Sequence, residues 1–316
     1  TLSDDRRQRQ MCIRDRAAAV KSSASARTIQ GLADAARSSN CGQVHAWFLS
    51  EAHGFWDALA NENGAAKDTA FLAANEALRI AVGAVAPGAK LTDGRRGARA
   101  VATALKAATK KAAPPLRHSL LVAMAETPGR VTRPLLKKWM ASKAPQEATM
   151  IAVLEGLGRA GDADAVPLLL GQLDGTTPGV LEAVLVGLFA LPKPLLKAEG
   201  RNLLTVLFKV FDVEGRDHAS LEHNAKRNAK QEVQLAAFKA RSAAWHTRRI
   251  LDTPPIKLPP GATGLPGVHA LIWRILDAGP KGIKPPEPPK EGFPRIMNGR
   301  PHLPGRGWTL WWKNAR

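Results

Sequence analysis

Apolar residues recur at intervals of three and four along most of this chain, which is the spacing of one face of a helix. The stretch QVHAWFLSEAHGFWDALA places on one such face Val44, Phe48, Phe55 and Leu59. The stretch DTAFLAANEALRIAVGAV does the same with Phe71, Leu78, Val82 and Val85. The pattern predicts helix after helix from Ala26 to about Leu251, with Gly and Pro at the junctions.

The prolines at these junctions follow a period. Pro134 and Pro167 are 33 residues apart and each is followed by Leu-Leu. Pro145 and Pro178 are also 33 residues apart, and each is predicted to open the next apolar helix in its first turn, where proline is tolerated. A period in the low thirties with two helices in each period is typical of an α-solenoid.

One stretch carries a specific resemblance. LGRAGDADAVPLLLGQLDGTTPGVLEAVLVGLFAL, residues 157–191, resembles a HEAT repeat of the short bacterial type in its Leu-Gly-x-x-Gly-Asp turn, its Ala-Val-Pro-Leu-Leu helix and its Pro-x-Val helix. The preceding unit, residues 131–156, matches less closely. The resemblance implies an all-α fold, an α-solenoid of HEAT-like helix pairs, and a role as an interaction scaffold that binds a macromolecular partner through its surface.

Asp162 and Asp164 in the Gly-Asp turn also form an Asp-x-Asp arrangement, which raises the alternative of a metal loop. Calcium requires about six oxygen ligands, usually including a bidentate Glu, and none follows within reach. In the resembling family the turn is structural. We therefore expect Gly161 to reverse the chain and Asp162 or Asp164 to cap the helix near Val166.

Composition divides the chain into four parts. Residues 1–16 have the character of a cloning-derived leader and lie outside the fold prediction. Residues 17–93 form a helical segment and residues 94–252 the HEAT-like repeats. Of the 23 Pro residues, 13 fall in 253–316, which predicts a Pro-rich, basic and largely irregular tail with one helix of about three turns in VHALIWRILDAG.

No catalytic motif stands out in the sequence. His45, Glu51 and His53 share a predicted helix without the spacing of a zinc motif, and HASLEH, residues 218–223, has one residue too many for one. Neither a nucleophile elbow nor a phosphate-binding loop is present. The sequence favours a non-catalytic protein without a cofactor or metal. A single cysteine outside the leader, Cys41, is compatible with a reducing cytosol, and no apolar run is long enough to span a bilayer.

The formal net charge is +19, of which the last 116 residues hold +11, and such an excess attracts polyanions. On a predicted helix over 216–251 a basic arc gathers Lys226, Arg227, Lys230, Arg241, Trp245, Arg248 and Arg249. A smaller group echoes it with Lys137, Lys138, Trp139 and Lys143. The arc is interpreted either as a solvated helix face or as a track for nucleic acid, on which cations neutralise phosphates and the Trp stacks. In the second interpretation the protein is a nucleic-acid-binding solenoid that resembles the HEAT-like DNA glycosylases.

Overall fold

The computed structural model describes residues 25–142, 145–173, 177–208, 267–285, 296–297 and 300–301. Every described element is a helix except for one pair of two-residue strands, so the prediction of a helical protein is confirmed. The chain divides into two compact units, Thr1–Thr149 and Met150–Arg316. The predicted boundary between residues 93 and 94 falls inside the first unit.

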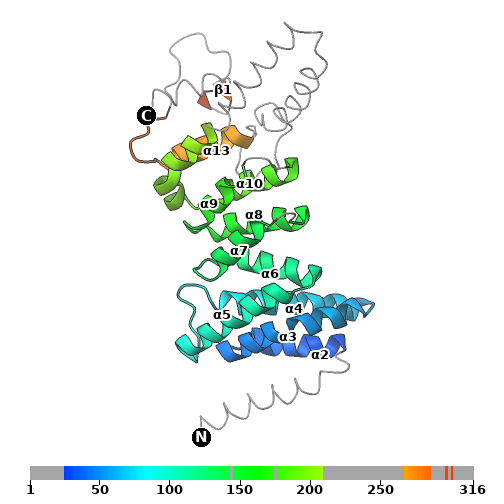
Figure 1. Ribbon diagram of the computed structural model, residues 1–316. Helices are drawn as coiled ribbons and strands as arrows, with labels where there is room; N and C mark the ends of the chain where they lie inside the picture. The colour runs from blue at the N-terminus through cyan, green and yellow to red at the C-terminus, as the bar shows by residue number, and fades with distance from the viewer. Residues whose placement is uncertain are drawn as a thin grey trace, which may run out of the picture. The chain divides into compact units, whose positions relative to one another are not determined.

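Within residues 25–142, a described part of the first unit, six helices pack in two alternating sets. Their bounds are α2 Ala26–Arg37, α3 Gly42–Ala60, α4 Ala65–Gly83, α5 Gly94–Lys111, α6 Pro114–Glu126 and α7 Thr132–Met140. Helix α2 packs mainly on α4, which continues to α6, while α3 packs mainly on α5. Figure 1 shows α2 to α5, in blue to cyan, lying alongside one another. Helices α2, α3 and α4 therefore each contact the next but one along the chain, and α3 also contacts α4.

The apolar faces predicted for the first two long helices are largely buried. Val44, Phe48, Phe55 and Leu59 are all in the core, as are Leu78 and Val82. The prediction is wrong for Phe71, which is 37% exposed and packs edge-on against Trp56 at the margin of the core. On α4 the buried face runs instead through small residues, including Ala70 and Ala74. Close helix packing there leaves no room for a Phe side chain.

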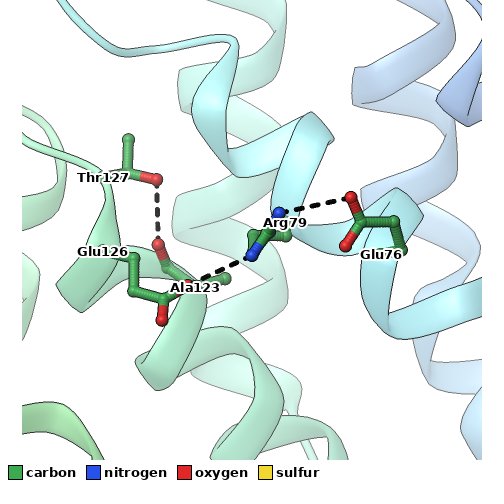
Figure 2. A network of polar contacts seen from close by, with 5 residues as sticks. All are labelled: Glu76, Arg79, Ala123, Glu126 and Thr127. Carbon is green, nitrogen blue, oxygen red and sulfur yellow. Dashed lines mark hydrogen bonds and ion pairs between the residues drawn. The ribbon is translucent and has the colours of Figure 1, made fainter. Parts of the chain in front are cut away.

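Polar contacts also join α4 to α6 (Figure 2). The guanidinium of Arg79 lies 3.3 Å from a carboxylate oxygen of Glu76 and 4.0 Å from one of Glu126. Thr127 ends α6 by donating its hydroxyl to the carbonyl of Ala123 at 2.8 Å. These ion pairs are half-exposed, so they contribute little to the free energy of unfolding. They show that the Glu126 carboxylate faces Arg79 of α4.

In the second unit the described helices are α8 Glu147–Ala160, which begins at the boundary, α9 Ala165–Leu170, α10 Pro178–Ala190 and α13 Gly267–Asp277. Residues 193–208 are helical as well. Helix α13 is the short helix that the sequence predicts in the tail, and it packs on α10 with Arg274 lying 4.7 Å from the ring centre of Phe189. The strands β1 Ile296–Met297 and β2 Arg300–Pro301 pair antiparallel.

The Gly-Asp turn is a chain reversal, as predicted, but the Asp164 side chain does not cap the next helix. Gly161 has a φ of 62° and so adopts the left-handed conformation that glycine favours. Asp164 stands at the N-cap of α9 in a helical conformation, and its side chain makes no capping hydrogen bond. Asp164 itself has helical φ and ψ, and a residue in that conformation does not direct its side chain at the first amides of the helix. The Ala165 N–H donates instead to the backbone carbonyl of Asp162 at 3.1 Å.

The prolines mark corresponding positions in two helix pairs. Pro134 is the third residue of α7 and Pro167 is the third residue of α9. Pro178 is the first residue of α10, as predicted, whereas Pro145 lies two residues ahead of α8 rather than in its first turn. The period of 33 residues therefore places Pro134 and Pro167 at the same position of their helices, whereas Pro145 and Pro178 differ in position.

Candidate functional site

The positive charge of the described chain is concentrated in one segment. Residues 94–140 contain eleven Lys and Arg and a single acid, Glu126, for a net charge of +10. By contrast residues 17–93 sum to −1 and residues 141–200 to −3. Arg133 is not part of a surface, because it is buried and donates to the carbonyls of Met124 and Ala125 near the end of α6. Most of the remaining cations lie on α5.

Helix α5 carries these cations in a line. We define the cationic stripe as Arg96, Arg99, Lys106 and Lys110, all exposed, with the exposed Thr103 between them. Their steps of three, four, three and four residues keep them within an arc of about 80° over a length of about 21 Å. The opposite face of α5 is buried through Gly97, Val101, Ala104 and Leu105. The stripe therefore points away from the helix layer.

No described carboxylate neutralises the stripe. The ion pairs within the described part of the chain involve none of the α5 cations. The exposed face has no large apolar side chain either: besides the stripe it presents Arg95, Ala107 and Lys111. The one acid of the segment, Glu126, faces Arg79 of α4. The surface is thus cationic and polar along its whole length.

This arrangement is unfavourable for the helix itself. Arg95 and Arg96 occupy the first turn of α5, which contains no acid, although the helix dipole favours anions there. The pairs Arg96–Arg99 and Lys106–Lys110 place like charges at i,i+3 and i,i+4, and each such pair costs about 0.2–0.5 kcal/mol. The dipole favours Lys110 and Lys111 in the last turn. The cations that folding alone does not explain are therefore Arg95 and Arg96, and binding of an anion does explain them.

The start of α5 is fixed by Asp93, which binds another helix. Its carboxylate accepts from the backbone N–H groups of Gly42 at 2.8 Å and Gln43 at 3.0 Å, the first residues of α3. It also accepts from the thiol of Cys41 at 3.5 Å. Asp93 therefore caps α3 from 51 residues away, in place of Cys41, whose own side chain makes no capping hydrogen bond.

Two glycines allow the helices to meet this closely. A Cβ atom on Gly42 would lie 2.5 Å from the Cα atom of Gly97, and one on Gly97 would overlap the Asp93 carboxylate. The other end of α5 is held by Arg117, which donates to the carbonyl of Ala112 at 2.8 Å. The stripe is consequently carried by a helix anchored at both ends.

The two groups with displaced pKa values lie at this junction and have structural causes. Burial raises the pKa of Asp93, but the amides of Gly42 and Gln43 and the Cys41 thiol outweigh burial, so the net pKa lies below its usual value. Burial lowers the pKa of His45, while the Ser39 carbonyl and the Asp93 charge oppose this without cancelling it. Asp93 is thus a permanent anion that holds α3 to α5.

The residues of the predicted basic arc, from Lys226 to Arg249, lie outside the described residues, as do HASLEH and Lys143. Of the smaller group, Lys137 and Lys138 are exposed on α7 and Trp139 is half-buried. Within the described residues no cluster of three His, Cys, Asp or Glu could hold a metal ion. None of the described helices combines the length and apolar character needed to cross a membrane.

The net charge of +11 over the last 116 residues draws attention to the C-terminal part of the chain and away from the exposed cations of α5. The signal is nevertheless present in GRRGARAVATALKAATKK, residues 94–111, which has six cations and no acid. A charge sum over short windows reveals this cluster of cations, whereas a sum over residues 201–316 does not include it.

Neither a family model, nor a curated protein, nor a solved structure matches the chain.

Proposed function

We propose that this protein is a non-catalytic interaction scaffold built from HEAT-like helix pairs, and that the cationic stripe of α5 binds an acidic macromolecule. The observation that carries this proposal is a line of four exposed cations on one helix face, none of which forms an ion pair with a described carboxylate. Such a line creates a one-signed field that attracts a polyanion and orients it along the helix.

Two features support the repeat architecture. Helices α2, α4 and α6 form one set and α3 and α5 another, as expected when helix pairs stack. Pro134 is the third residue of α7 and Pro167 is the third residue of α9, as expected for equivalent helices of successive pairs. Each of these two helices is preceded by a glycine with positive φ, Gly129 at 143° and Gly161 at 62°. Stacked pairs present extended surfaces, which is why such proteins commonly bind partners.

The anchoring of α5 supports a binding role for its outer face. Asp93 at one end and Arg117 at the other hold the helix in place, so its cations project from a fixed backbone. A preformed array loses less conformational freedom on binding than a mobile segment does. The unfavourable placement of Arg95 and Arg96 is offset only when an anion is bound.

The test is retention on an immobilised sulfated polysaccharide, used as a generic polyanion. A variant with Arg99, Lys106 and Lys110 replaced by Gln should elute at lower salt than the wild type. The matched control replaces Arg27, Arg37 and Lys67 of α2 and α4 by Gln, which removes the same charge elsewhere. If the two variants elute together, charge in general and not the stripe governs binding, and the proposal is wrong.

A further inference from the structure

We infer that the partner of the stripe is a nucleic acid duplex, contacted through the phosphates of its backbone and without preference for sequence. This inference rests on the proposed function, since it names the acidic macromolecule bound by the same face. The residues concerned are Arg96, Arg99, Lys106 and Lys110, together with the spacing that α5 imposes on them.

The dimensions of the stripe fit a regular phosphate backbone. Its ends are separated by about 21 Å along the helix axis. One strand of a DNA duplex has a phosphate every 3.4 Å of axis, so the stripe faces about six phosphates and offers four cations to them. A straight rigid row of cations matches a charge array that is itself regular and stiff.

The chemistry of the face distinguishes a duplex from an acidic protein. Protein interfaces usually centre on aromatic or large apolar side chains and are depleted of charge at that centre. The exposed face of α5 has no such side chain at its centre, where Thr103 lies between cations. Interfaces with nucleic acid are more polar and far more positive, as this face is.

The same face also argues against single strands. Proteins that bind single strands place aromatic rings where successive bases can stack. On α3, the helix that packs against α5, the side chain of Trp47 is half-buried and packs edge-on against Phe55, with 6.1 Å between the ring centres. Without an exposed ring on α5, unstacked bases gain nothing, whereas the outer backbone of a duplex needs only cations.

The inference is tested by anisotropy of a labelled duplex of about 20 base pairs, in DNA and RNA forms, with salt varied between about 50 and 200 mM. Each phosphate contact contributes about −0.9 to the slope of log K against log salt, so replacing Arg99, Lys106 and Lys110 by Gln should flatten it by about 2.7. The ratio of wild-type to variant affinity then changes about 40-fold over this range. Gln preserves helix propensity, and far-UV circular dichroism checks that helix content is unchanged.

Control variants and ligands separate the outcomes. The Arg27, Arg37 and Lys67 triple variant should retain the wild-type slope, and two duplexes of unrelated sequence should bind equally. A single strand and polyglutamate should each show a smaller α5-dependent change than the duplex. Flattening with polyglutamate and not with a duplex would identify an acidic protein as partner: this inference would fail and the proposed function would survive.

An unchanged duplex slope in the α5 variant, with loss of slope on replacing Arg241, Arg248 and Arg249 by Gln, would move binding to the predicted basic arc and overturn the inference.

Discussion

At the scale of single residues, the junction between α3 and α5 depends on the absence of two side chains. Gly42 and Gly97 let the helices approach until the Asp93 carboxylate reaches the first amides of α3. Even a partly buried carboxylate is costly unless it is hydrogen-bonded, and here two amides and a thiol satisfy it. The glycines and Asp93 therefore act as one unit.

Replacing Gly97 by Ala should lower the free energy of unfolding by about 1–3 kcal/mol, because the added methyl group overlaps the Asp93 carboxylate in a packed site. Urea denaturation measures the effect. The control is Gly54→Ala on α3, where a Cβ atom meets nothing within 4 Å. That change should raise the free energy of unfolding by about 0.5–1 kcal/mol through helix propensity. Equal behaviour of the two variants would contradict the close approach.

At the scale of elements, α5 has two faces with opposite demands. Its buried face carries Val101, Ala104 and Leu105 and holds the helix against α3. Its exposed face carries the cationic stripe, whose first cations oppose the helix dipole and whose last cations favour it. Stability and binding can therefore be separated by position along the same helix.

Arg96→Gln and Lys110→Gln each remove one stripe cation and should weaken binding of a polyanion alike. Their effects on the free energy of unfolding should differ by about 0.5–2 kcal/mol, with Arg96→Gln the more stable, because a cation is unfavourable at the start of a helix and favourable at its end. Thermal denaturation at low salt and the anisotropy assay give the two readouts. Variants of equal stability would show that the dipole does not act on these side chains.

At the scale of the whole chain, charge is segregated along the sequence. The segment 94–140 has a net charge of +10, between a segment at −1 and one at −3. Like charges at this density repel one another in the folded state, because neighbouring stripe cations lie closer than the screening length of about 10 Å at 0.1 M salt. The folded chain should accordingly be more stable when salt or a polyanion screens them.

Raising the salt concentration from low values to about 0.2 M should increase the midpoint of thermal unfolding by about 2–4 °C, the shift expected for about 1 kcal/mol. The triple Gln variant of Arg99, Lys106 and Lys110 should show a smaller rise. The triple variant of Arg27, Arg37 and Lys67 serves as the reference, since it loses the same charge outside the segment. A rise that is the same in both variants would place the repulsion elsewhere in the chain.

Local sequence patterns predict much of the helical fold. The spacing of Val44, Phe48 and Leu59 identifies the buried face of α3, and the two prolines followed by Leu-Leu both fall on the third residue of a helix. Prediction fails at Phe71, because at this level of α4 the buried face runs through Ala70 and Ala74 and leaves Phe71 at its edge. Periodicity reports which residues share a face, but not how far a neighbour extends along that face.

The sequence by itself determined that this chain forms helices and how much charge residues 94–111 carry, since these follow from the residues themselves and from interactions within a few positions. Only the tertiary structure decided that Asp93 caps a helix 51 residues away, that Gly97 is required there, and that the cations of α5 face away from α3. Those features depend on groups brought together by folding, and no periodicity along the chain encodes the distance between them.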